Sequence, residues 1–285
     1  MLKMNEPNAT VRNVSDTARW VAYFRARETE RSDALFRDPY AERLAGERGF
    51  QIANSLPDGT NHEWAWVART YLFDQFLVRV LEEGVDLVVN LAAGLDARPY
   101  RMDLAASLQW VEIDFPEIIS YKADILASEE PRCHLERIPL DLSDTSARRT
   151  LFAELNRRAK NIAVVSEGLL IYFSADEVGS LGRDLAAGTN FQYWILDLAS
   201  PGQLKLMQRS MGKQLSEASA AFKFGPPEGP NFFVPHGWEP IDIQGLLKTA
   251  ARFKRSPAGL FPMAIGRTGA PGDFPWTGVC LFAKR

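Results

Sequence analysis

The sequence predicts an α/β fold in which helices cover both faces of a mostly parallel β-sheet. Short apolar runs rich in β-branched residues alternate with segments of helical periodicity between about residue 60 and residue 200. Strands that are joined through helices pair in parallel. In addition, the stretch from Val85 to Lys122 has the order strand, turn of small residues, helix and second strand. That order is typical of a nucleotide-binding βαβ unit.

Helices are expected before this stretch. Apolar residues around Trp20 have helical spacing, and Asp38-Pro39 has the residue types of a cap and first turn. The segment 46–59 contains glycines and a proline and is expected to be a loop. A long helix over 62–83 is predicted next, because its apolar residues recur with a period of 3.6 and Gly84 ends it.

Apolar runs in the next part of the chain predict the strands of the sheet. Leu87–Val89 gives the first strand, and Val111–Asp114 gives a second strand that ends on a carboxylate. Ala163-Val164-Val165 is expected to be buried on both faces. The other elements predicted here are a strand over 133–142, a helix over 150–159, a strand starting at 161, a helix capped by Ser174 and Glu177, and a strand over 191–200.

The alternation weakens beyond residue 200. We expect helices over 204–224 and 241–253, a loop over 224–238, and late strands over 260–265 and 277–283 that complete the sheet. The loop is expected to cover the site. Its aromatic residues would suit a flat apolar ligand, although core packing explains them equally well: Phe224, Phe232, Phe233 and Trp238.

The composition argues against several classes of function. The 33 basic and 36 acidic residues leave a net charge of -3, which argues against a protein held on nucleic acid mainly by charge. No apolar stretch reaches the roughly 20 residues that span a bilayer, and the N-terminus lacks a secretory apolar core. A soluble, cytoplasmic protein without membrane partners is therefore expected. Cys133 and Cys280 share no metal-ligand spacing, so we predict buried thiols and no metal site.

The turn after the first strand narrows the choice of nucleotide. A GxGxxG dinucleotide fingerprint needs three glycines, whereas Gly94 is the single glycine in LAAGLD. S-adenosyl-L-methionine (SAM) suits the same layout, but its methionyl end needs a cation for the carboxylate and anions or carbonyls near the ammonium. Arg69 on the long helix and Glu167 after the fourth strand have that chemistry. Asp114, about 20 residues after the turn, can accept hydrogen bonds from ribose hydroxyls.

Several motifs in one order carry a family resemblance from about Ser15 to Tyr172: RARETERSDALFRDPYAERLAG, ARTYLFD, NLAAGLDARPYR, VEIDFPEIISYK and SEGLLIYF. The chain resembles the leucine carboxyl methyltransferase family of SAM-dependent methyltransferases, and within it the bacterial branch typified by the polyketide O-methyltransferase TcmP. The resemblance implies a single class I methyltransferase domain with a seven-stranded sheet. Its expected parts are an N-terminal helical extension (1–84), a SAM-binding core (85–200), a helical insert or lid (201–250) and C-terminal strands (251–285).

The resemblance also implies roles for individual residues. Ala92 departs from the family pattern, which usually has glycine at this position of the turn. The implied cofactor-binding residues are Arg69 for the SAM carboxylate, Gly94 for the methionyl part, Asp114 for the ribose, Asp141 and Leu142 for the adenine, Glu167 for the methionyl amine, and Arg27 as a basic residue from the N-terminal segment. The residues alone leave alternatives: turn or helix caps for Asp114 and Asp141, and a structural ion pair for Glu167. Asp96 and Arg98 are expected to orient one another or Arg69.

Methyl transfer from a sulfonium is an in-line displacement, so positioning is expected to supply much of the acceleration. A carboxylate acceptor is already ionised, whereas a hydroxyl benefits from a base, for which His236 and Tyr172 are the candidates. We predict an O-methyltransferase that uses SAM, releases S-adenosyl-L-homocysteine (SAH) and methylates a hydroxyl or carboxylate of a small molecule such as a polyketide. The alternatives are methylation of a protein C-terminal carboxylate and a catalytically silent SAM-binding protein. The sequence does not indicate the oligomeric state.

Overall fold

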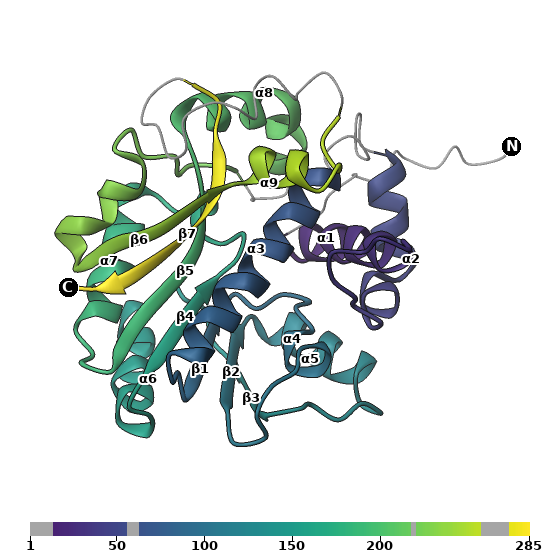
Figure 1. The fold of residues 1–285 in the computed structure, drawn as a ribbon. Coiled ribbons are helices and arrows are strands. Elements are labelled where there is room, and N and C mark those ends of the chain that lie inside the picture. Colours follow the sequence, from purple (N-terminus) through teal and green to yellow (C-terminus); the bar gives the residue numbers. More distant parts are fainter. Residues whose placement is uncertain (1–13, 56–62, 218–220, 258–273) are drawn as a thin grey trace, which may run out of the picture.

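A mixed β-sheet forms the centre of the computed structural model, which describes residues 14–55, 63–217, 221–257 and 274–285 (Figure 1). The strands are β1 (Leu87–Leu91), β2 (Gln109–Asp114), β3 (His134–Pro139), β4 (Ile162–Ser166), β5 (Phe191–Ala199), β6 (Trp238–Gly245) and β7 (Thr277–Lys284). Within the described residues they form a seven-stranded sheet in the order β3-β2-β1-β4-β5-β7-β6. The first five strands pair in parallel, and β7 is antiparallel to both neighbours. The prediction of a mostly parallel sheet is confirmed.

β1 and β4 lie side by side in the middle of the sheet, and every residue of both strands is buried. Their sequences, LVVNL and IAVVS, are nearly continuous apolar runs, as expected for strands covered on both faces. From β1 the chain continues to β2 and β3 on one side, and it returns to β4 and β5 on the other. Ligands of open α/β sheets bind at the carboxyl ends of the strands beside such a reversal.

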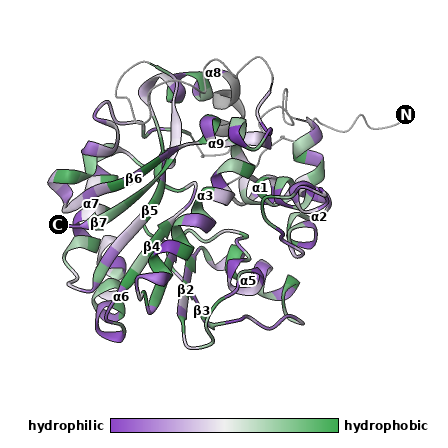
Figure 2. Cartoon of the chain, viewed as in Figure 1, coloured by the Kyte–Doolittle hydropathy of each residue, from purple (hydrophilic) through white to green (hydrophobic). Residues whose placement is uncertain are grey.

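Helices cover both faces of this sheet. One buried cluster joins α3 and α9 to the sheet around Trp110, and another joins α6 and α7 to the opposite face around Trp194. Figure 2 shows the hydrophobic residues of the central strands between these layers. The predicted capping box of Ser174 and Glu177 is present at the start of α7. The helices of this part are α3 (Glu63–Glu82), α4 (Arg98–Arg101), α5 (Pro116–Ile125), α6 (Thr145–Arg158), α7 (Ala175–Ala186) and α9 (Leu246–Arg252).

Two N-terminal helices, α1 (Val14–Thr29) and α2 (Ala41–Ser55), pack against each other beside the sheet (Figure 1). The prediction of a loop over 46–59 is wrong for residues 46–55. There α2 continues past a kink at Gly46, which has a φ of 56°. The helix continues because Ile52 and Ala53 are buried in a cluster with residues of α1. Residues 56–59 lie outside the described part of the chain.

The C-terminal part differs most from the prediction. Residues 238–245 form β6, although a helix was expected from residue 241, and helix α9 starts at Leu246. The segment is a strand because it pairs with β7, and such long-range pairing outweighs local helical periodicity. The expected late strand over 277–283 is confirmed as β7, whereas 260–265 lies outside the described residues. Two further elements are α8 (Pro201–Glu217) and the 3₁₀ segment η2 (Gly229–His236).

Candidate functional site

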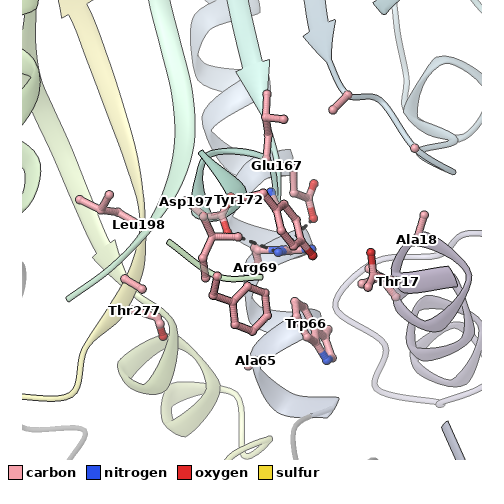
Figure 3. Close-up of a pocket in the computed structure, with 18 of the residues that line it drawn as sticks. Thr17, Ala18, Ala65, Trp66, Arg69, Glu167, Tyr172, Asp197, Leu198 and Thr277 are labelled. Carbon is pink, nitrogen blue, oxygen red and sulfur yellow. Dashed lines mark hydrogen bonds and ion pairs between the residues drawn. The ribbon is translucent and has the colours of Figure 1, made fainter. Parts of the chain in front are cut away.

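A cavity of about 1160 Å³ lies at the carboxyl ends of the parallel strands (Figure 3). Its lining comes from the segments after β1, β2, β3 and β4, from the end of β5, and from α1, α3 and α8. Arg69, Glu167 and Asp197 converge on it from three different elements (Figure 3). The cavity therefore lies where the strand order reverses, which is the usual ligand position in this class of fold.

The turn after β1 forms one wall of the cavity. Ala92 and Gly94 both have positive φ angles, 51° and 49°. Glycine adopts this conformation freely, whereas alanine adopts it at a cost of about 1 kcal/mol. Because the two side chains are a methyl group and a hydrogen atom, the backbone of the turn is open to close approach by a ligand.

Asp114 ends β2 and faces this turn. Its Oδ2 accepts a hydrogen bond of 2.6 Å from the N–H of Gly94, and its Oδ1 accepts one of 2.7 Å from the N–H of Phe115. Burial raises the pKa of this carboxyl, and the two N–H donors oppose the shift. Asp114 thus lines the cavity, at the position predicted for a ribose-binding acid. The bond from Phe115 shows that it also caps the turn.

Arg69 is held between two carboxylates and an aromatic ring. Its Nε lies 3.1 Å from Oε1 of Glu167, and its Nη1 lies 3.3 Å from Oδ2 of Asp197. The guanidinium also lies 4.6 Å from the centre of the Trp66 ring. The Gly168 N–H donates to Asp197 over 2.6 Å, and a Cβ at Gly168 would come within 3.1 Å of Arg69. This close approach, together with a φ of 68°, favours glycine at 168.

Arg98 contacts the other carboxylate oxygen of Glu167. Its Nη1 lies 2.8 Å from Oε2 of Glu167, and the same guanidinium pairs with Asp96 and Asp74. Asp74 is shared in turn with Arg101. Although burial acts to raise it, the guanidinium of Arg98 holds the pKa of Asp96 well below its usual range. The prediction that Asp96 and Arg98 orient one another is confirmed.

Asp141 and Leu142 follow β3 and both line the cavity. The Asp141 side chain is exposed, and its Oδ1 accepts a hydrogen bond of 2.8 Å from the N–H of Ser143. Leu142 is buried, and its carbonyl accepts a hydrogen bond of 2.9 Å from Nη1 of Arg148. The turn that Asp141 caps therefore fixes the backbone of Leu142 against the cavity. A role of Asp141 toward adenine stays a prediction.

The structure separates Arg27 from the cavity. The Arg27 side chain is 42% exposed and pairs with Glu63 over 3.3 Å, and it is not part of the lining. Arg25 lines the cavity instead, where its Nη2 donates to the carbonyl of Leu95 and its Nε pairs with Asp38. Residues two apart on a helix point about 200° apart, so Arg25 and Arg27 cannot both face one ligand. Arg27 therefore does not line the cavity, and its contact with SAM stays a prediction.

His236 lies outside the cavity lining. Its ring packs against Gly179 of α7, and its Nδ1 lies 3.0 Å from Nη1 of Arg183. The next strand, β6, begins at Trp238, opposite the end of β7, so His236 lies at the amino edge of the sheet. The cavity is at the carboxyl edge. The prediction of His236 as a base is therefore wrong, because it assumed that this loop covers the site.

Tyr172 lines the cavity near Arg69 (Figure 3). Burial raises the pKa of its phenol, although a hydrogen bond with Thr17 opposes the shift. The phenol is therefore protonated at neutral pH. The position fits the prediction, but the chemistry at this position is that of a hydrogen-bond donor and not of a base.

Four aromatic residues form a second part of the cavity lining. Trp20, Trp66, Tyr172 and Phe222 line the cavity and pack in one cluster; we refer to these four residues as the aromatic section. Of the loop aromatics singled out in the sequence, Phe224 lines the cavity. Phe232, Phe233 and Trp238 are absent from the lining and pack in the core, which is the alternative left open above.

Asp197 is a charged cavity residue that the sequence predictions missed. It lies near the end of β5, in the run FQYWILDLA. An acid near the end of an apolar strand is the same signal that pointed to Asp114 on β2. Within the described residues, no group of three or more histidine, cysteine or acidic side chains is arranged to hold a metal ion. No described helix is long and apolar enough to cross a membrane.

Comparison with known proteins identifies the family. Residues 18–186 match the leucine carboxyl methyltransferase family. The chain is also 32% identical, over 88% of its length and 91% of the relative's, to a candidate S-adenosyl-L-methionine-dependent methyltransferase of Frankia alni. The chain belongs to the leucine carboxyl methyltransferase family. A second such candidate, from Parafrankia sp., is 30% identical to this family member, over 95% of this chain and 87% of the relative.

Two solved structures show the same fold as this leucine carboxyl methyltransferase family member. A DUF574 family protein from Streptomyces avermitilis aligns over 94% of this chain and 97% of its own, with a TM-score of 0.62 and 12% identity. A candidate methyltransferase from Thermobifida fusca aligns over 98% and 97%, with a TM-score of 0.54 and 16% identity. The class I methyltransferase fold with extra N-terminal helices is thereby confirmed.

The residues of the cavity fit the chemistry of SAM, which is the methyl donor named for these relatives. The turn at Gly94 offers an open backbone, and Asp114 offers carboxylate oxygens for hydroxyl groups. Arg69 offers a cation, and Glu167 and Asp197 offer two acids beside it. An amino acid end with its own carboxylate and amine needs this combination of charges.

Proposed function

We propose that this protein is a SAM-dependent O-methyltransferase that acts on a hydroxyl or carboxylate of a small, largely apolar molecule. The observation that carries the proposal is a single cavity with two chemically different parts. Arg69, Glu167 and the Gly94 turn form the polar part, and the aromatic section continues from it. A transfer site needs this arrangement, because donor and acceptor must be aligned side by side.

The polar part would hold the methyl donor. SAM, when bound, supplies a methyl group activated by its sulfonium sulfur. Arg69 would bind the donor's carboxylate, Glu167 its amine, and Asp114 its ribose hydroxyls, with the backbone at Gly94 against the methionyl chain. Leu142 and the exposed ring of Phe115 would flank the adenine.

The aromatic section would hold the acceptor. Its rings favour a flat apolar molecule, and a polyketide-like phenol or acid of the TcmP type has that shape. The cavity lining within the described residues contains no histidine or cysteine. A carboxylate acceptor needs no base, and a hydroxyl acceptor would give its proton to a carboxylate of the cavity or to water. The Tyr172 hydroxyl would orient the acceptor oxygen as a hydrogen-bond donor.

Binding of SAM and SAH, measured by calorimetry, tests this proposal. Wild-type protein should bind both, and Arg69→Ala and Asp114→Ala should each lose at least about tenfold in affinity while staying folded. Arg79→Ala is the matched control, because Arg79 lies on the same helix and pairs with Asp242 outside the cavity lining. Transfer of radiolabelled methyl groups to a panel of phenols and aromatic acids would then identify the acceptor class. Absence of binding to either ligand by the wild type would refute the proposal.

A further inference from the structure

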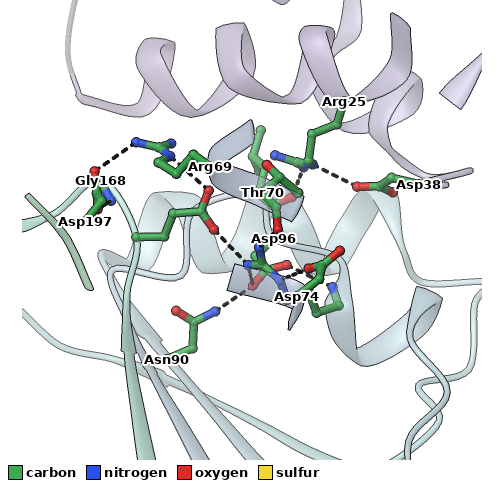
Figure 4. Close-up of polar contacts among 12 residues, drawn as sticks. Arg25, Asp38, Arg69, Thr70, Asp74, Asn90, Asp96, Gly168 and Asp197 are labelled. Carbon is green, nitrogen blue, oxygen red and sulfur yellow. Dashed lines mark hydrogen bonds and ion pairs between the residues drawn. The ribbon is translucent and has the colours of Figure 1, made fainter. Parts of the chain in front are cut away.

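A chain of ion pairs runs along the carboxyl edge of the sheet and ends at Asp197 (Figure 4). It links Asp197, Arg69, Glu167, Arg98, Asp96, Asp74 and Arg101. These are four carboxylates and three guanidiniums, so the chain carries one net negative charge. A longer contact of 3.9 Å from Arg101 to Asp38 extends it to Arg25. That extension adds one acid and one base, so the excess negative charge remains.

Asp197 is the carboxylate of this chain with the weakest pairing. Glu167 contacts two arginines, and so does Asp74. Asp197 contacts one arginine, Arg69, at 3.3 Å, which is the longest carboxylate–guanidinium contact among the four acids. Its side chain is 21% exposed, compared with 16% for Glu167. The excess negative charge is therefore concentrated at the Asp197 end, where it can interact with a ligand.

Asp197 neighbours Arg69 of the polar part and Tyr172 of the aromatic section. Glu167 follows β4, and Asp197 lies on β5, the next strand away from the Gly94 turn. The ring of Tyr172, which belongs to the aromatic section, lies near Asp197 (Figure 3). The reactive sulfur of SAM must lie where the methionyl-binding residues meet the acceptor. In the arrangement proposed above, Asp197 would lie near this sulfur, because it neighbours both Arg69 and Tyr172.

We propose that Asp197 supplies the counter-charge of the sulfonium and thereby makes the site prefer SAM over SAH. The inference rests on the function proposed above. SAM carries an ammonium, a sulfonium and a carboxylate, and therefore one net positive charge. SAH lacks the sulfonium charge and has no net charge. A site with one excess negative charge attracts the first molecule more strongly than the second, and the low polarity of a partly buried site strengthens this difference. Transfer of the methyl group therefore leaves a product, SAH, that the site binds less tightly than SAM.

The test is the ratio of the SAH and SAM dissociation constants in the wild type and in Asp197→Asn. Asparagine keeps an oxygen that accepts the Gly168 N–H but removes the charge. We expect the preference for SAM to fall about tenfold, equivalent to about 1.4 kcal/mol. Asp197→Ser, which removes the same charge with a smaller side chain, should show the same fall. Sinefungin, which carries an ammonium in place of the methylsulfonium, should lose affinity in parallel with SAM.

Asp242→Asn serves as the control, because Asp242 also pairs with an arginine but is absent from the cavity lining. It should leave the ratio unchanged. If both Asp197 variants weaken SAM and SAH equally, or affect neither, the inference is overturned, because Asp197 then merely positions Arg69 or does nothing for the ligand. That result would leave the proposed function intact. Failure of the wild type to bind either ligand would instead overturn the proposed function and this inference together.

Discussion

The Nη1 atom of Arg98 lies 2.8 Å from Oε2 of Glu167. Glu167 is thereby fixed from both sides, because Arg69 contacts its other oxygen at 3.1 Å. Arg98 is 2% exposed; its Nη1 also contacts Asp96, and its Nε pairs with Asp74. The two arginines therefore have different tasks. Arg98 orients the acid, and Arg69 remains the cation beside the open part of the cavity.

This arrangement predicts that Arg98→Ala lowers the free energy of unfolding by about 3–5 kcal/mol. The loss arises because the substitution leaves three acids near each other without their shared cation. Urea denaturation followed by circular dichroism measures it. Arg149→Ala is the control, since Arg149 is 62% exposed and pairs with Asp184, and it should change stability by at most about 0.5 kcal/mol. Equal losses in the two variants would contradict this account of Arg98.

Sequence patterns located the site because its residues follow apolar strands. Asp114 ends the run WVEID, and Glu167 follows IAVVS. In a parallel sheet the carboxyl ends of neighbouring strands meet at one edge, so acids at those positions come together without further information. Arg69 could be predicted for a different reason: an arginine near the apolar stripe of a helix needs an anionic partner.

The remaining differences between prediction and structure arise from long-range geometry. His236 was misplaced because the pairing of β6 with β7 decides on which edge of the sheet it lies, and no local pattern encodes that pairing. Arg27 was preferred over Arg25 although the two point away from each other on α1. The choice between them depends on how α1 is rotated against the sheet. Asp197 was overlooked because apolar residues continue after it in the same strand.

The positive φ of Ala92 predicts that its substitution by glycine has an unusually small effect on stability. Ala92→Gly should change stability by no more than about 0.5 kcal/mol, because relief of backbone strain offsets the greater freedom of glycine in the unfolded chain. Ala153→Gly at an exposed position of helix α6 should lose about 1 kcal/mol. Thermal and urea denaturation of both variants measure the difference. Similar losses at the two positions would show that Ala92 is not strained.

The two thiols should be unreactive in the folded protein. Burial, with a smaller effect of Glu112, raises the pKa of the Cys133 thiol to about 11, and burial also raises the pKa of Cys280. The nucleophile is the thiolate, so Ellman's reagent at neutral pH should label neither residue within minutes. Both should react at once in denaturant. Rapid labelling of the folded protein would contradict the buried positions of both thiols.

The preference for SAM over SAH should depend on pH if Asp197 provides the counter-charge. Burial raises the pKa of Asp197, Glu167 raises it further, and Arg69 and the N–H of Gly168 oppose the shift. Two other groups near it, Tyr172 at the end of the 3₁₀ segment η1 (Leu170–Tyr172) and Cys280 on β7, stay neutral because their own pKa values are raised by burial.

Because the preference requires the ionised carboxylate, it should be complete at pH values above the pKa of Asp197 and should be lost as the pH falls through it. Dissociation constants for SAM and SAH, measured from about pH 8 to about pH 5, give the ratio at each pH. In Asp197→Asn the ratio should be lower and should vary much less over this range, since Glu167 is then the remaining nearby carboxylate. A wild-type ratio that does not change with pH would show that the charge of Asp197 is not what distinguishes the two ligands.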